Sequence, residues 1–154
     1  MVKIVIQRVK RSSVTVNGTI VGQIQTGALV LVGISKNDTE SDLDLAVNEM
    51  LNVCLWPDAE GNEWQLGVKD ANLEILLVSQ FTLQARYGNG KKPDFSRAMS
   101  HENARVLFDL YVEKTKKVYQ ENKVQTGEFG AMMDVEIVND GPATLVIDFA
   151  VQRN

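Results

Sequence analysis

At least six segments of this 154-residue chain have the residue pattern of β-strands, whereas only two have the pattern of helices. The strand-like segments are rich in β-branched residues and lie at 2–9, 13–16, 19–21, 28–32, 75–83, 133–138 and 143–150. The helical segments follow residues 39 and 100. We therefore predict an α+β fold, in which a mostly antiparallel sheet curls into a barrel-like core and carries two main helices.

Turn and cap signals support these boundaries. Asn17-Gly18 separates two strands and tolerates positive φ at both positions, which predicts a tight hairpin. Thr39 with Asp42 three residues later resembles a capping box, and Ser100 can cap the second helix. The predicted apolar stripes comprise Leu43, Ala46, Val47, Met50, Leu51 and Cys54 on the first helix, and Ala104, Leu107, Phe108, Tyr111 and Val118 on the second.

The composition predicts one compact domain that spans residues 1–154. The chain is 44% hydrophobic and 23% charged, which is ordinary for globular proteins, and a chain of this size buries roughly 70% of its unfolded surface. No apolar run approaches about 18 residues, so we expect no membrane segment. The N-terminus lacks the pattern of a signal peptide, and Cys54 is the single cysteine, so we expect a cytoplasmic protein without disulfides.

The charge and the scarcity of metal-binding side chains limit the chemistry. The net charge is −4, whereas proteins that bind long duplexes through phosphates are usually basic, so any contact with nucleic acid should be local. His101 is the one histidine and is expected at the surface, and the acidic residues form no set typical of a metal site. We therefore expect no metal and no cofactor. The basic, glycine-rich stretch Gly88–Lys92 is either a phosphate contact or a solvated loop.

The predicted strand at 75–83 ends in polar residues. Ser79, Gln80 and Thr82 stand where a buried strand normally carries apolar side chains, and buried polar groups cost free energy unless they are hydrogen-bonded. Two interpretations are open: the strand emerges into solvent, or its end lines a pocket. Alternation would place Gln80 and Thr82 on one face, with Ser79 and Phe81 on the other.

Two further features invite a functional interpretation. Asp140-Gly141-Pro142-Ala143 separates the last two predicted strands, and is either a plain hairpin tip or a rigid tip that presents backbone carbonyls. Arg8 interrupts an apolar strand. It is either a surface charge on an edge strand or an inward guanidinium that needs carbonyl acceptors.

Four short strings together resemble the D-aminoacyl-tRNA deacylase family, also known as the D-tyrosyl-tRNA deacylase family. They are Ile6–Val9, Gly33–Thr39, the string SQFTL at Ser79–Leu83 and the string NDGPAT at Asn139–Thr144. The last two lie about sixty residues apart in the order typical of the family, and the resemblance covers nearly the whole chain. Ala143 departs from the family pattern, in which valine is usual.

The resemblance implies an enzyme that hydrolyses the ester of D-aminoacyl-tRNA, and also glycyl-tRNA. Family members are homodimers whose active site combines the SQFTL segment of one subunit with a cis Gly-Pro tip of the other, which excludes L-amino acids. The residues carried over are Ser79, Gln80, Phe81 and Thr82 as catalytic, and Gly141, Pro142, Arg8, Ala104, Phe129 and Met133 as substrate-binding. Arg8 matches the arginine that holds the partner's tip.

The implied mechanism needs no metal. The 2′-hydroxyl of the terminal adenosine assists catalysis, while backbone N–H groups near Phe81 and Thr82 stabilise the developing negative charge. The expected partner is the acceptor end of aminoacyl-tRNA, with Lys91, Lys92 and Arg86 as phosphate contacts. Two alternatives stay open: a deacylase of relaxed chirality with a trans Gly-Pro bond, and a non-catalytic nucleic-acid-binding or replication-associated module on the same fold.

Overall fold

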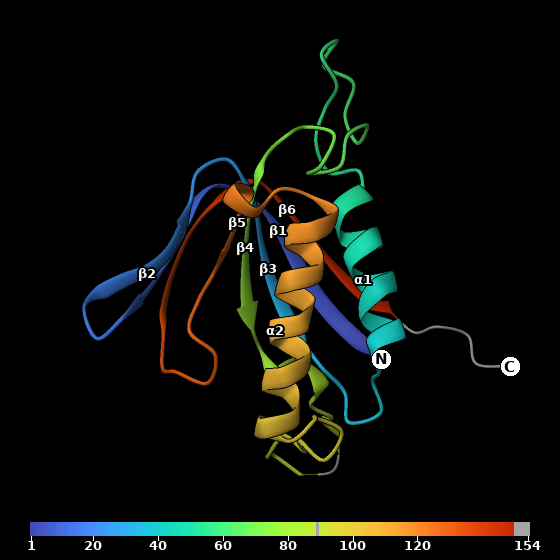
Figure 1. The fold of residues 1–154 in the computed structure, drawn as a ribbon, viewed down its shortest axis with the longest axis vertical. Coiled ribbons are helices and arrows are strands. Elements are labelled where there is room, and N and C mark those ends of the chain that lie inside the picture. Colours follow the sequence, from blue (N-terminus) through green and yellow to red (C-terminus); the bar gives the residue numbers. More distant parts are fainter. Residues whose placement is uncertain (89, 150–154) are drawn as a thin grey trace, which may run out of the picture.

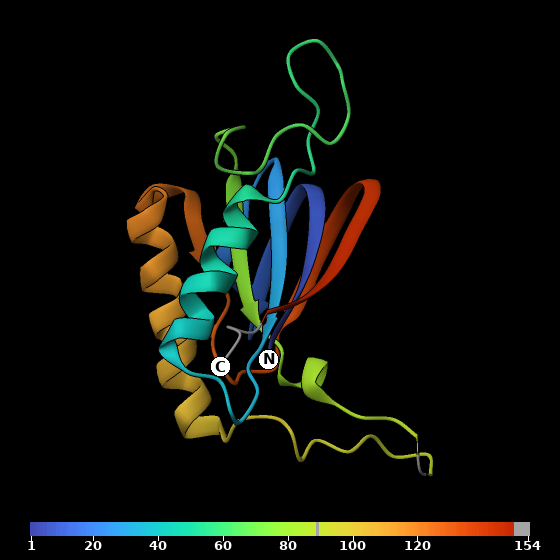
Figure 2. The same cartoon turned by 90° about the vertical axis from the view of Figure 1, so that its right-hand side faces the viewer.

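The computed structural model describes residues 1–88 and 90–149. The elements are β1 (Val2–Val16), β2 (Thr19–Ile24), β3 (Gly27–Gly33), α1 (Glu40–Asn52), β4 (Glu74–Ser79), the 3-10 helix η1 (Phe81–Gln84), α2 (His101–Val118), the 3-10 helix η2 (Glu121–Lys123), β5 (Val124–Thr126) and β6 (Asp134–Phe149). The helices α1 and α2 lie side by side and cover one face of the sheet (Figures 1 and 2). The predicted α+β class with two main helices is confirmed.

The sheet is mixed and nearly closes on itself. β1 pairs antiparallel with β6 along one edge, and along the other edge with β3 and then with β2. β3, β4 and β5 are parallel neighbours. At Gly22 of β2, a Cβ atom would collide with the backbone carbonyl of Thr126 in β5. Because only glycine allows this approach, β2 and β5 can meet and the sheet takes the predicted barrel-like form.

The strands at both ends of the chain are longer than predicted. The expected strands 2–9 and 13–16 form one strand, β1, and the expected strands 133–138 and 143–150 merge into β6, except that residue 133 precedes β6 and residue 150 lies outside the described residues. The Asn17-Gly18 hairpin is confirmed, with φ of 49° and 79°. A long partner strand explains the merging of the C-terminal segments, because both halves of β6 pair with β1.

The segment around Gly141-Pro142 is therefore a bulge within one strand and not a hairpin tip. Gln7 pairs with Thr144, but Val9 pairs with Asn139, so four residues of β6 lie opposite Arg8 alone. Extra residues on one strand leave the ladder and protrude. The interpretation of this segment as a plain hairpin tip is wrong, and the segment is referred to below as the Gly-Pro bulge.

The predicted strand 75–83 is also shorter than expected. β4 ends at Ser79, and the chain turns into η1, with hydrogen bonds from Leu83 N to Gln80 O and from Ala85 N to Thr82 O. The expected alternation of residues 79–82 between two faces is therefore wrong. Gly33 permits this packing, since a Cβ atom there would lie 2.8 Å from Leu83 Cβ. The polar strand end becomes a tight turn against the end of β3.

The helices bury most of their predicted apolar stripes. The Asp42 carboxylate accepts a 2.7 Å hydrogen bond from the Thr39 backbone N–H, as the capping box requires. Leu43, Ala46, Val47, Met50 and Leu51 are buried, and so are Phe108 and Tyr111. Cys54 is exposed because the helix has ended at its cap, Val53, and Val118 is exposed at the last turn of α2. The assignment of these two residues to the core is wrong.

The helices that the structure describes show no membrane-spanning segment. Within residues 1–88 and 90–149, none is both long and apolar enough to cross a bilayer.

Candidate active site

A cavity of about 690 Å³ opens where β4 ends and α2 begins. The end of β4 and the start of α2 lie in the lower part of the ribbon in Figures 1 and 2. Its walls come from the ends of β3 and β4, the first turns of α2 and the segment that leads into β6. Six residues predicted for the site line it: Ser79, Gln80, Phe81, Ala104, Phe129 and Met133. Segments far apart in the sequence thus meet in one place, which we call the main pocket.

Aromatic rings dominate one wall of the main pocket. The Phe129 ring lies 5.1 Å from the ring of His101 and 5.7 Å from that of Phe108, measured between centroids. Phe81 and Phe95 also line the main pocket and form an edge-to-face pair at 5.2 Å. Flat apolar surfaces of this kind can stack on a nucleobase. The lining is largely apolar with a few polar groups, as is usual for small-molecule sites.

Ser79 and Gln80, where β4 turns into η1, contribute polar groups to the main pocket. The Gln80 side-chain amide donates a hydrogen bond to the Thr82 hydroxyl. An amide N–H cannot accept a proton, so this contact does not activate the hydroxyl as a nucleophile. Among the described residues, no acceptor is found for the backbone N–H groups of Phe81 and Thr82, the first two positions of η1. These N–H groups are free to bind a negative charge.

Arg8 points inward and holds the Gly-Pro bulge of its own chain. Its Nε donates to the Asp140 carbonyl oxygen at 3.0 Å, and a terminal nitrogen donates to the Leu55 carbonyl oxygen at 2.7 Å. Only 12% of its side chain is exposed, and the guanidinium lies 5.9 Å from the centroid of the Trp64 ring. The interpretation of Arg8 as a surface charge is wrong. The resemblance implied a contact with the partner's tip, whereas the observed contact is within one chain.

The Gly-Pro bulge does not reach the main pocket of its own chain. The Gly141-Pro142 bond is cis, and Gly141 has a φ of +125°, which favours glycine. Neither residue, nor Arg8, lines the main pocket, and Thr82 is not part of its wall. The predicted site residues therefore form two groups: the main pocket with the adjoining turn, and the bulge held by Arg8.

Among the pocket-lining residues that were not predicted for the site, two lie on α2. His101 was expected at the surface without a role, and Phe108 only in the core; both line the main pocket. The signal was helical spacing, because residues 101, 104 and 108 lie three and four apart and so share a face of α2. Once Ala104 was assigned to the pocket, that spacing would have added both.

The fold and the site together define a protein with a nearly closed mixed sheet, an aromatic-lined pocket at a strand end and a cis Gly-Pro bulge on another strand. Within residues 1–88 and 90–149, no group of three histidine, cysteine or acidic side chains is arranged to hold a metal ion. The family model described as "D-Tyr-tRNA(Tyr) deacylase" matches residues 5–148. The chain belongs to this family.

Similar proteins cover almost the whole chain. A D-aminoacyl-tRNA deacylase of Thermosipho melanesiensis is 47% identical over 144 residues, which are 94% of this chain and 95% of the relative. One of Rippkaea orientalis is 47% identical over 147 residues, covering 95% and 99%. The solved structure of a protein named "c-Myc DNA Unwinding Element Binding Protein" is 42% identical, with a TM-score of 0.93 and coverage of 97% of this chain and 99% of that chain.

Proposed function

We propose that the protein hydrolyses the ester bond of D-aminoacyl-tRNA and releases the free D-amino acid and tRNA. The observation that carries this proposal is the main pocket, in which the Ser79–Phe81 turn meets Ala104, Phe129 and Met133 in a chain of the deacylase family. An aromatic wall suits the terminal adenosine, and the polar turn suits the ester. Residues 1–154 would form one such domain, acting in the cytoplasm on the acceptor end of tRNA.

We further propose that the working enzyme is a homodimer whose active site is shared between subunits. The Gly-Pro bulge lies outside the main pocket of its own chain, so a second copy would have to supply it. The strand that carries the bulge supports this, because the second edge of β6 pairs with no strand among the described residues. Val146 on the outward face of β6 is 65% exposed beside Val5 of β1. An exposed apolar side chain next to an unpaired strand edge is available for pairing with a second chain.

In this arrangement the bulge selects the enantiomer and the substrate assists its own hydrolysis. Backbone carbonyls of the partner's Gly141-Pro142 would engage the α-amino group and occupy the space of an L side chain, whereas D-amino acids and glycine would fit. The 2′-hydroxyl of the adenosine would act in place of a protein nucleophile. The free N–H groups of Phe81 and Thr82 would stabilise the oxyanion, and one such donor accounts for about 10²–10³ in rate in other enzymes.

The test is a deacylation assay with matched D-tyrosyl-, L-tyrosyl- and glycyl-tRNA. We expect the D-tyrosyl and glycyl esters to be cleaved, while the L-tyrosyl ester survives at the same enzyme concentration, because its side chain would meet the bulge. Release of labelled amino acid measures each rate. Cleavage of both tyrosyl esters at similar rates would instead indicate a deacylase of relaxed chirality.

The Thr82 hydroxyl should be dispensable. Thr82→Ala is expected to keep most of the activity, because the hydroxyl contacts an amide donor and no base, while the backbone N–H remains. The measurement is single-turnover deacylation of D-tyrosyl-tRNA, with circular dichroism to verify the fold. Loss of all turnover in a folded protein that still binds tRNA would make Thr82 the nucleophile and refute substrate assistance.

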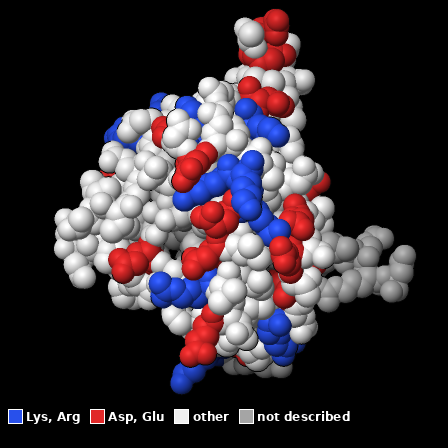
Figure 3. Space-filling view, viewed as in Figure 1, with Lys and Arg blue, Asp and Glu red and all other residues white. Residues whose placement is uncertain are grey.

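A DNA-binding role is the second candidate. The observation that favours it is the 42% identity to a protein whose name describes binding to a DNA unwinding element. The net charge of −4 opposes it. The face that carries α1 and α2 mixes acidic and basic side chains (Figure 3), and Lys114 there bridges Glu40 and Asp44 at 2.9 and 2.6 Å. Tight binding of duplex DNA by a protein without deacylase turnover would favour this second role.

A further inference from the structure

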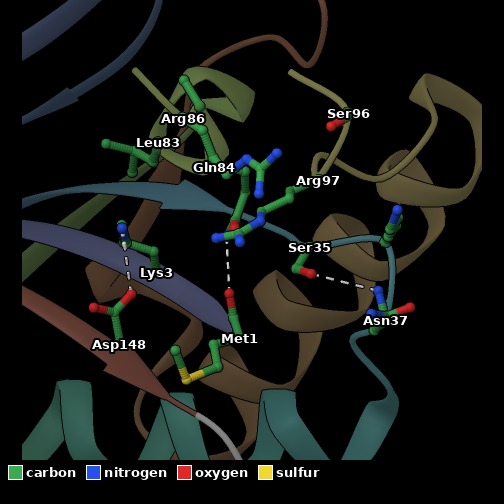
Figure 4. A pocket seen from close by; sticks show the side chains of 12 residues that line it. Met1, Lys3, Ser35, Asn37, Leu83, Gln84, Arg86, Ser96, Arg97 and Asp148 are labelled. Atoms are coloured by element: carbon green, nitrogen blue, oxygen red, sulfur yellow. Dashed lines mark hydrogen bonds and ion pairs between the residues drawn. The ribbon is translucent and has the colours of Figure 1, made fainter. Parts of the chain in front are cut away.

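A second cavity, of about 430 Å³, lies where β1 begins and η1 ends, and it is lined mainly by polar groups. Its floor is held by the buried side chain of Gln84, whose amide donates to the Met1 carbonyl oxygen at 2.8 Å and to the Gly33 carbonyl oxygen at 2.9 Å. Figure 4 shows Arg97 extending toward the Gln84–Met1 hydrogen bond. The cavity is therefore built on a fixed polar base, and we call it the basic cavity.

Four basic side chains line the basic cavity: Lys3, Lys36, Arg86 and Arg97. Two of them are neutralised. Lys3 lies 3.5 Å from Asp148, and Arg86 lies 3.4 Å from Asp94. Hydrogen bonds from Ser96 hold the pKa of the Asp94 carboxyl below its usual value, so that carboxylate keeps its charge near neutral pH.

The other two cations have no such partner. Among the residues that the structure describes, Lys36 and Arg97 have no carboxylate within ion-pair distance. Their backbones are directly hydrogen-bonded, because Lys36 N donates to Arg97 O at 2.9 Å. Two unpaired cations in one cavity repel each other and attract an anion. In a chain of net charge −4, this local excess of positive charge indicates an anion site.

The basic cavity and the main pocket share a wall. Residues that are adjacent in sequence line different cavities. Ile34, Phe95 and Ala98 line the main pocket, whereas their neighbours Ser35, Ser96 and Arg97 line the basic cavity. Consecutive Cα atoms are about 3.8 Å apart. The wall is thus about one residue thick, so the two cavities are close enough for adjacent units of one polymer to occupy them.

We propose that the basic cavity binds a backbone phosphate of the single-stranded acceptor end, with Arg97 as the main contact and Lys36 as the second cation. This proposal rests on the proposed function, because the main pocket must hold the terminal adenosine. The planar guanidinium of Arg97 can donate two parallel hydrogen bonds to phosphate oxygens. The contact would fix the polynucleotide next to the ester and would carry no base specificity.

The test compares two substrates of the full-length protein: D-tyrosyl-tRNA and the D-tyrosyl ester of adenosine, which has no phosphate. We expect Arg97→Gln to lower kcat/KM for the tRNA roughly 10- to 100-fold, the range of one hydrogen bond to a charged group. The loss should appear in KM, while hydrolysis of the nucleoside ester stays unchanged. The slope of log K against log salt for tRNA binding should fall by about 0.7, the contribution of one single-strand phosphate.

Two further variants sharpen the comparison. Arg97→Lys keeps the charge and should recover part of the loss in KM. Lys117→Gln removes the same charge from the exposed C-terminal turn of α2, away from both cavities, and should leave both substrates unaffected. Circular dichroism verifies that each variant is folded.

Two outcomes would overturn the phosphate site: Arg97→Gln slows both substrates equally, or it changes neither. In the second case, inhibition of the wild type by millimolar inorganic phosphate that Arg97→Gln abolishes would identify a free anion as the ligand. If the wild type hydrolysed neither substrate, the proposed function itself would fail, so the two failures are distinguishable.

Discussion

Val146→Asp should convert the protein into a monomer of about 17 kDa and lower the deacylation of D-tyrosyl-tRNA at least about 100-fold. Val146 is 65% exposed on the outward face of β6, so aspartate is well solvated in an isolated chain and costs the fold little. In a dimer formed through this face, the same carboxylate would be buried without a partner. An unpaired buried charge costs about 3–5 kcal/mol, or roughly two to four powers of ten in association.

The control for this variant is Val106→Asp. Val106 is 66% exposed on α2, so the substitution is the same and the exposure is matched, but the site lies away from β6. We expect this variant to be dimeric and active. Light scattering after size exclusion measures the mass, and the deacylation assay measures turnover. An active Val146→Asp monomer would show that the Gly-Pro bulge of a second copy is not needed.

Ala104→Phe should lower kcat/KM for D-tyrosyl-tRNA by about 100-fold or more. Ala104 is the small residue of the α2 face that lines the main pocket, and a benzyl side chain there would fill space beside Phe129 and Met133. Displacing a reacting group by about 1 Å can cost about 100-fold in rate. Ala104 is only partly buried, so the variant should fold.

Val106→Phe serves as the matched control, because it places the same ring on the exposed side of α2. Its kinetics should equal those of the wild type. The free energy of unfolding of both variants, measured in urea, shows whether a loss of activity comes from a destabilised fold or from a blocked pocket. Wild-type kinetics for a folded Ala104→Phe would show that the main pocket does not hold the substrate. The proposed reaction would then need a different site on the protein.

Local patterns were sufficient to predict the helices and the hairpin. The capping box at Thr39, the Asn17-Gly18 turn and the apolar stripe of α1 depend on residues within a few positions of each other. Such interactions are encoded in adjacent sequence, so a local pattern is enough to predict them. The errors occurred at Cys54 and Val118, at the ends of helices, where periodicity continues although the helix stops.

The turn at the polar end of β4 and the inward orientation of Arg8 depend on contacts with residues that are distant in sequence. The turn from β4 into η1 depends on Gly33, which allows Leu83 to approach β3. Arg8 finds its acceptors on Leu55 and Asp140, which are 47 and 132 residues away in sequence. Both interpretations of Arg8 were compatible with its neighbours in the strand, because the choice depends on acceptors that a local pattern does not contain.

The sequence by itself determined the α+β class, the helices and the hairpin, and the family resemblance predicted candidate site residues, six of which line the main pocket. The tertiary structure decided that 140–143 bulges from one long strand, that the main pocket and the bulge lie apart in one chain, and that Arg97 and Lys36 share a second cavity. The reason is physical. Turns and caps are short-range, whereas strand pairing, cavities and unpaired charges arise only when distant segments pack together.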